Sequence, residues 1–275
     1  MNRKALSGLV LACVALLGGC ARVRQIVPVE GPVLGPAYAT QVDVVNWRGP
    51  VEITANPNAK APYVKVRNEK LGKGPKRKEL AATTTATAVS SFEGGRPVLR
   101  VVTRPASEPP ANVATRLTIV VPQIGGATVR NTDGTIELTG GSGPVVIDNT
   151  GAGGDVTVRT AAAMTESVNV RTSAGRVLYQ VGPGSTGKFE LTSDSGQAKF
   201  DSQVGVVRQA KSEPGHYRGQ LDGESSTAIG VNPVMLHSGA GDVMARVIPN
   251  AMTFTERWDG GWPTSPTWLA RLGGK

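Results

Sequence analysis

The stretch Ser167–Tyr179 reads SVNVRTSAGRVLY, and its pattern decides the fold class. Apolar and polar residues alternate on both sides of a polar turn that contains Gly175. Alternation with a period of two is typical of a β-strand that buries one face. The stretch therefore predicts two short strands joined by a tight turn.

The same unit recurs through the second half of the chain. Clear copies occupy Ala127–Leu138, Val145–Val158, Lys188–Phe200 and Val234–Val247, and a weaker one surrounds Gly219. The turn glycines of all six units are spaced 20 to 23 residues apart, at positions 134, 154, 175, 196, 219 and 241. A near-constant spacing of this kind indicates stacked repeats.

We therefore expect an all-β fold whose body is a β-solenoid, a single-chain β-helix with coils of about 21 residues. The alternative is an antiparallel β-sandwich made of hairpins in series, because the turn Thr132-Asp133-Gly134 also suits a hairpin. Composition agrees with many short strands, since aromatic residues make up only 4% of the chain while glycine (35) and proline (19) are abundant.

The first twenty residues have the three-part layout of a secretory signal peptide. Arg3 and Lys4 are followed by the apolar run Ala5–Leu17, which is too short for a membrane-spanning helix. The segment ends in Leu17-Gly18-Gly19-Cys20. An ordinary signal peptide with a cysteine at its cleavage site is the alternative reading.

Leu17-Gly18-Gly19-Cys20 resembles the lipobox of bacterial lipoproteins, with a less common glycine at position 18. The resemblance implies cleavage between Gly19 and Cys20. It further implies that the Cys20 sulfur takes a diacylglycerol and that the new amino group takes a fatty acid such as palmitate. Ala21 stands where an inner-membrane retention signal would usually have aspartate. The resemblance thus implies a lipid anchor, most consistent with the outer membrane of a bacterial cell envelope.

Five segments follow from these patterns. We expect a signal peptide (1–19), a lipidated cysteine with a Pro/Gly-rich tether (20–41), an N-terminal β region (42–122), the repeats (123–248) and a C-terminal segment (249–275). That last segment holds Trp258, Trp262 and Trp268. It is either a cap over the end of the repeats or an aromatic contact patch for a sugar, a membrane or a partner.

Cleavage before Cys20 leaves 256 residues with 28 basic and 21 acidic side chains, a net charge of +7. Cys20 is then the only cysteine, so neither an intramolecular disulfide nor a cysteine-rich zinc site can form. A basic protein at a cell envelope has anionic polymers and envelope proteins as candidate partners, whereas nucleic acid does not fit the compartment. The basic run Lys73, Lys76, Arg77, Lys78 is either a solvated loop or an anion-binding surface.

Leu117–Pro122, followed by the glycine-turn repeats, is similar to the bacterial "putative adhesin" domain family of unknown function. The similarity covers about residues 42 to 248. It implies an N-terminal strand region followed by β-solenoid coils, and it brings no catalytic residues.

The sequence offers no catalytic motif, nucleotide fingerprint or metal-ligand motif, so we predict a non-enzyme without a cofactor or metal. His216 and His237 stand far apart in the sequence without a nucleophile motif. The alternative is a polysaccharide-active enzyme that uses a column of turn aspartates, namely Asp133, Asp155, Asp194 and Asp242. Their preference for turns explains them equally well. A third hypothesis is an assembly component of an envelope complex.

Overall fold

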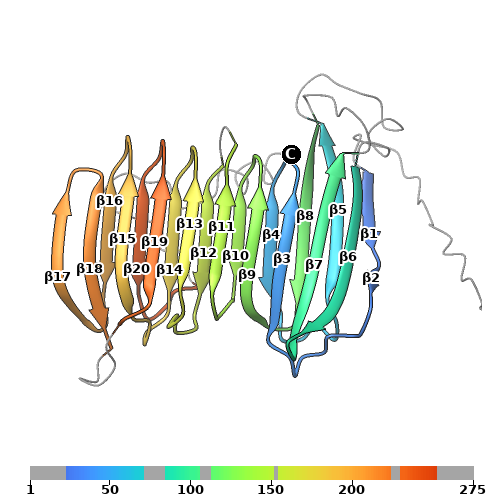
Figure 1. The fold of residues 1–275 in the computed structure, drawn as a ribbon, viewed down its shortest axis with the longest axis horizontal. Coiled ribbons are helices and arrows are strands. Elements are labelled where there is room, and N and C mark those ends of the chain that lie inside the picture. The colour runs from blue at the N-terminus through green and yellow to red at the C-terminus, as the bar shows by residue number, and fades with distance from the viewer. Residues whose placement is uncertain (1–22, 71–83, 106–112, 152–153, 224–229, 253–275) are drawn as a thin grey trace, which may run out of the picture.

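The structure is a computed structural model and describes residues 23–70, 84–105, 113–151, 154–223 and 230–252. Within these ranges the chain forms twenty β-strands and no helix, which confirms the all-β prediction. The strands make two sheets that lie face to face around one hydrophobic core (Figure 1). The described part of the chain accordingly contains no helix that could cross a membrane.

The nine-stranded sheet contains, in spatial order, β1 (Val23–Val27), β5 (Tyr63–Lys70), β8 (Val113–Val121), β4 (Val51–Ala55), β10 (Ile136–Thr139), β12 (Val156–Thr160), β14 (Val177–Val181), β20 (Val243–Val247) and β16 (Ala198–Ser202). The eleven-stranded sheet contains β17 (Val206–Glu213), β18 (His216–Asp222), β15 (Gly187–Ser193), β19 (Pro233–Ser238), β13 (Val168–Thr172), β11 (Val145–Asn149), β9 (Ile124–Asn131), β3 (Thr40–Asn46), β7 (Arg96–Pro105), β6 (Thr84–Glu93) and β2 (Val29–Glu30).

The β-solenoid prediction is wrong. In stacked repeats each unit contacts its neighbours along the chain, but here both sheets are mixed and their strand order departs from chain order. Strands β1 and β5 pair antiparallel, as do β17 and β18. The last strands of the chain, β19 and β20, lie between β13 and β15 and between β14 and β16. Two facing sheets fit the sandwich alternative, although most strand pairs are parallel rather than antiparallel.

One of the six expected turn glycines, Gly219, lies inside strand β18 and not in a turn. The other units are equivalent, and their regular spacing suggested a stack in chain order. Equivalent units stack with their strands in register whatever their order in the chain, as the pairing of Val168 with Val234 shows. The repeat pattern does not indicate which units are neighbours in the sheets. A stack in chain order was therefore only one of several arrangements that the pattern allows.

Alternate residues of most strands point into the space between the sheets; β17, whose residues are all exposed, is an exception. Val168 and Val170 of β13 face Val177 and Tyr179 of β14, and each of these side chains is at most 1% exposed. Full burial of such a side chain contributes about 1.5–3 kcal/mol. The other face of each strand is partly exposed, so the alternation read from the sequence is the alternation of core and surface.

Four aromatic side chains, those of Tyr179, Phe189, Phe200 and Tyr217, gather at one end of the core. The eleven-stranded sheet extends beyond the other sheet by β18 and β17. There the ring of Phe200 lies 4.6 Å from that of Phe189 and stacks 5.2 Å from that of Tyr217. Because β16 has no further neighbour in its own sheet, these rings close the gap that would otherwise open between the sheets.

At the opposite end the chain enters both sheets at once. β1 is the edge strand of the nine-stranded sheet, and after Pro28 the chain crosses to β2, the edge of the other sheet. Leu34, a few residues later, is fully buried. We expected residues 20–41 to form a tether, but the described part of that stretch belongs to the folded body.

The C-terminal segment is described only as far as residue 252. Its visible part packs against the body, since the backbone carbonyl of the buried Ala251 accepts a hydrogen bond of 2.6 Å from Gln180 Nε2. The three tryptophans predicted to cap or contact a partner lie outside the described residues, so that prediction stands untested.

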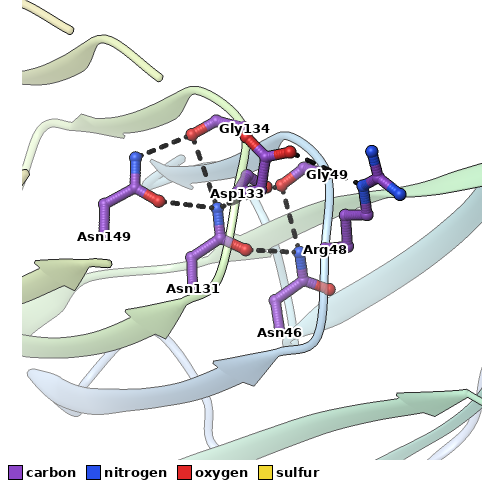
Figure 2. Close-up of polar contacts among 7 residues, drawn as sticks. All are labelled: Asn46, Arg48, Gly49, Asn131, Asp133, Gly134 and Asn149. Atoms are coloured by element: carbon purple, nitrogen blue, oxygen red, sulfur yellow. Dashed lines mark hydrogen bonds and ion pairs between the residues drawn. The ribbon is translucent and has the colours of Figure 1, made fainter. Parts of the chain in front are cut away.

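A buried polar ladder joins the turns at one edge of the sandwich. Asn46, Asn131 and Asn149 end neighbouring strands in register, and all three are at most 3% exposed. Each amide donates to the next along the row: Asn46 Nδ2 to Asn131 Oδ1 at 2.9 Å, and Asn131 Nδ2 to Asn149 Oδ1 at 3.3 Å (Figure 2). Buried amides are tolerated because these bonds satisfy them.

The same amides hold the turns that follow their strands. Asn131 Nδ2 lies 3.2 Å from the carbonyl oxygen of Gly49 and 3.0 Å from that of Asp133, and Asn149 Nδ2 lies 2.9 Å from that of Gly134 (Figure 2). Buried turn carbonyls need such donors, because an unpaired one costs about 1–3 kcal/mol.

Hydroxyl groups take over the role of the amides further along the row. Thr172 Oγ1 donates to the carbonyl of Ala174 at 2.9 Å, and Ser238 Oγ donates to that of Gly175 at 2.6 Å. Ser193 Oγ donates in turn to the carbonyl of Gly241 at 2.6 Å. Six stacked turns are therefore tied by one continuous row of buried side chains.

The close stacking of these turns requires glycine. Gly134 has a φ of +115°, and a Cβ atom there would lie 2.4 Å from the carbonyl carbon of Gly49. Gly175 has a φ of +114°, and its Cβ would lie 2.4 Å from the Gly154 oxygen. Other residues rarely adopt this backbone conformation, so the turn glycines mark positions where one turn touches the next.

We predict that Asn131→Asp destabilises the protein strongly at pH 7. The substitution keeps the shape of the side chain but turns its donating amide into a carboxylate that faces carbonyl oxygens. We expect the free energy of unfolding to fall by about 3 kcal/mol, and the melting temperature by about 9 °C for a protein of this size. Circular dichroism melting measures the change. Asn58→Asp, in an exposed turn, is the matched control; an equal loss there would contradict the role of the ladder.

Candidate functional surface

The stacked turns do not bring the predicted aspartates into a column. Strand register fixes which residues share the position just after each turn glycine. In spatial order these are Pro50, Thr135, Asp155, Arg176, Asp242 and Gln197. Asp155 and Asp242 share this position, but Arg176 lies between them. Paired carboxylates for glycoside cleavage are thus absent from this row.

Asp155 and Asp242 each hold the neighbouring turn. Asp155 Oδ1 accepts a hydrogen bond of 2.9 Å from the backbone N–H of Arg176, and its Oδ2 pairs with the Arg176 guanidinium at 2.5 Å. Asp242 Oδ1 accepts one of 2.8 Å from the backbone N–H of Gln197. Both carboxylates therefore have a structural explanation.

Asp133 and Asp194 occupy other positions in their turns. Both precede the turn glycine, Asp133 by one residue and Asp194 by two. Asp133 pairs with Arg48 at 3.5 Å, and Asp194 lies 3.7 Å from His237 Nε2. The four aspartates thus face different neighbours, and the hypothesis of a carboxylate-based enzyme loses its site.

The two histidines, distant in the sequence, flank the same residue. Register places His237 of β19 and His216 of β18 on either side of Thr192 of β15, on the outer face of the eleven-stranded sheet. His216 Nδ1 lies 3.3 Å from Thr192 Oγ1. A threonine–imidazole contact of this length does not by itself identify an activated nucleophile. No group of three metal-ligating side chains occurs in the described ranges.

An open hollow of about 660 Å³ lies beside this row, over strands β11, β13, β19 and β15. These strands run side by side in the eleven-stranded sheet (Figure 1). Met235 and Leu236 are its apolar lining residues, and the others are polar, among them Asp148, Asn169, Arg171, Glu190 and His237. They are the outward-pointing residues of the repeat units.

Charges of both signs meet in this hollow. Asp148 of β11 stands opposite Arg171 of β13, and Arg171 opposite His237 of β19. Neighbouring strands lie about 4.8 Å apart, so the three side chains present an acid, a cation and an imidazole at regular intervals. Glu190, by contrast, pairs with Arg218 across the adjacent strands at 2.6 Å.

The floor of the hollow contains a polar atom without a partner. Asn169 Oδ1 is buried and makes no hydrogen bond to any described residue. Beside it, Val146 and Met235 are 43% and 38% exposed. Buried acceptors without partners are uncommon in proteins. The hollow therefore combines an unpaired buried acceptor with exposed apolar side chains, an arrangement that can bind a ligand.

Other predicted site residues lie outside the described part of the chain. These are the cleavage pair Gly19 and Cys20 and the basic residues Lys73, Lys76, Arg77 and Lys78. The hollow itself was missed by sequence reasoning. The only signal in the sequence was the polar residue at every second position of each repeat strand. Such residues are expected to point outward, but the sequence does not show that they lie next to one another.

Comparisons with known proteins agree with the fold. No model of a known protein family matches the sequence, and no curated protein matches it. The crystal structure of a "putative cell adhesion protein" from Clostridium sporogenes is similar, with 12% identity, a TM-score of 0.52, and coverage of 82% of this chain and 100% of the other. This likeness concerns the fold alone.

Two further crystal structures align over the same share of this chain but superpose too loosely to inform the fold. One is a "putative adhesin" from Bacteroides fragilis, with 10% identity, a TM-score of 0.38 and coverage of 97% of its own chain. The other is a "putative lipid binding protein" from Parabacteroides distasonis, with 12% identity, a TM-score of 0.28 and coverage of 96%.

We predict that Asp155→Ala lowers stability more than Asp148→Ala does. Asp155 loses its bonds to the neighbouring turn, which are partly exposed and together contribute about 1 kcal/mol. Asp148 forms no ion pair with a described residue, and its replacement should change stability by less than about 0.5 kcal/mol. Urea unfolding at pH 7 measures both. A larger loss for Asp148→Ala would contradict the assignment of Asp155 to structure and Asp148 to the surface.

Proposed function

We propose that this protein is a lipid-anchored component of the bacterial cell envelope. We further propose that its two-sheet body binds envelope polymers or envelope proteins without catalysing a reaction, in the manner of an adhesin. The observation that carries the proposal is the open polar hollow over β11, β13, β19 and β15. The fold likeness to a structure described as a putative cell adhesion protein supports it.

The anchor follows from the first twenty residues. The short apolar run and the lipobox-like ending assign Cys20 as the acylated residue and Gly19–Cys20 as the cleaved bond. One acyl chain alone would hold a protein marginally, whereas several on one residue give a stable attachment. Ala21 favours the outer membrane as its destination.

The ligand chemistry follows from the hollow. Arg171 can donate in a planar fork, and Asp148 in the neighbouring strand can accept. A pair of this kind can contact adjacent hydroxyl or acidic groups of a polymer at once. With few apolar contacts, each site is weak, so we expect binding to depend on several contacts along an extended ligand.

The enzyme alternative gains no support from the described residues. The turn aspartates are separated by Arg176 or held by their neighbours, and the histidines have no activated nucleophile. Binding at an exposed sheet face requires neither.

We predict that Arg171→Glu weakens binding to immobilised lipopolysaccharide or purified peptidoglycan by about tenfold at low salt. The change removes a charge-assisted donor that is worth about 1.5–3 kcal/mol. Biolayer interferometry with each polymer measures the effect. Arg96→Glu, an equal change of charge at the exposed start of β7, is the control. Equal loss in both variants would mean that only net charge matters. Lys76→Glu with Arg77→Glu and Lys78→Glu tests the basic run in the same assay.

We predict that Cys20→Ala releases the protein from membranes. Without the sulfur no diacylglycerol can attach, so the variant should lack the mass of the acyl groups. Intact-mass spectrometry and membrane fractionation provide the measurements. A variant that stays on membranes, while the wild type carries no added mass, would overturn the anchor.

A further inference from the structure

The folded body begins almost immediately after the proposed anchor. Cys20 precedes Val23, the first residue of β1, by three residues. An extended chain spans at most about 3.6 Å per residue, so these residues reach about 11 Å. If Cys20 is acylated, the start of β1 must lie close to the lipid surface.

The strands nearest this point form one end of the molecule. β1 is the edge of the nine-stranded sheet and β2 the edge of the other, while β16 and β17 are the edges at the opposite end (Figure 1). With strands about 4.8 Å apart, the ten steps from β2 to β17 cover about 48 Å. The short tether therefore holds the β1–β2 end close to the membrane, while the β17 end lies about 48 Å along the sheet from that point.

The end that carries β1 exposes apolar side chains. Ile26 of β1 is 66% exposed, and Val33, just beyond β2, is 73% exposed. They have the largest exposed fractions among the described large apolar residues except for Val231. Apolar groups of this kind gain from contact with the boundary between lipid head groups and acyl chains.

The same end carries an excess of positive charge. Arg24, Arg67 and Arg116 stand opposite one another on β1, β5 and β8, and Lys65 stands opposite Ile26. Only two of these four cations have a carboxylate partner: Arg67 and Arg116 both pair with Glu69, at 2.9 and 3.0 Å. Arg24 and Lys65 form no ion pair with a described residue.

Charge is balanced at the opposite end. Arg208 of β17 pairs with Asp222 at 2.8 Å, and Lys211 pairs with Glu213 at 2.9 Å. Hydrogen bonds from Gln220 and from the backbone of Gly230, together with Arg208, hold the pKa of Asp222 below its usual range. An anionic surface attracts basic residues close to it, so it would favour the β1 end over the β17 end.

We propose that the β1–β2 end of the sandwich, with Ile26 and the cations Arg24 and Lys65, rests against an anionic lipid surface while the β17–β18 end points away. The inference rests on the proposed anchor at Cys20. It adds an orientation to the anchor, which a flexible tether would not impose.

Site-specific fluorescence tests the orientation. The acylated Cys20 is the only cysteine of the processed chain, so one introduced cysteine gives one label. Ile26→Cys reports on the β1 end, and Val206→Cys, 46% exposed on β17, is the matched control. Each full-length, acylated protein is labelled with an environment-sensitive maleimide in phosphatidylglycerol–phosphatidylethanolamine vesicles that contain brominated lipid.

We expect at least threefold stronger quenching at position 26 than at position 206. Replacing Arg24 and Lys65 with glutamine in the Ile26→Cys protein should reduce the docked population, because each basic residue near an anionic surface contributes about a fivefold factor. Equal quenching at both positions, in protein that floats with vesicles and carries the acyl mass, would overturn the orientation alone. Protein that carries no acyl mass and does not float would overturn the anchor as well.

Discussion

The buried row of amide and hydroxyl groups at the turns is the interaction on which the rest of the body depends. A parallel arrangement brings every turn of one edge into contact with the next, and it buries carbonyl groups that no strand can pair. The ladder that begins at Asn46 and Asn131 supplies the missing donors. Glycine at the turns lets the row close up, because any Cβ atom at Gly134 would meet the neighbouring turn. These contacts between turns fix the register of the strands. The register in turn decides which side chains stand next to one another on the outer face of each sheet.

The candidate surface is a product of that register. Arg171 and Asp148 belong to different units, and they meet because β11 and β13 pair without an offset. A shift of either strand by one residue would turn the side chain of that strand into the core and remove it from its neighbour. The turn aspartates illustrate the same rule with the opposite result, because Arg176 occupies the position between Asp155 and Asp242 and separates the two carboxylates. The same in-register pairing thus produces the candidate surface on the outer face of the eleven-stranded sheet and structural contacts at the edge formed by the turns.

Local structure was predictable from the sequence, and neighbour relations were not. The alternation in Ser167–Tyr179 gave β13 and β14 correctly because one face of each strand is buried. The order of the units could not be read, since Val234 and Phe189 begin units of equal pattern and either could pair with Val168 by pattern alone. The antiparallel strands at the β1 end lack the repeat and were assigned only to a β region, whereas β17 and β18 were wrongly assigned to a weak repeat around Gly219. The hollow was out of reach for the same reason, as its residues converge only once the order is known.

The position of β19 and β20 has a consequence for how the chain is made. These strands are the last of the described body to leave the ribosome, yet they fill a place between units that were made earlier. Strands β15 and β16 cannot pair with β19 and β20 until residue 247 has emerged. Loss of the last unit would not shorten the stack at its end but would divide it and create four unpaired edges. The body is therefore completed from within, and a chain that ends early should be recognised by the cell as unfinished rather than tolerated as a shorter version.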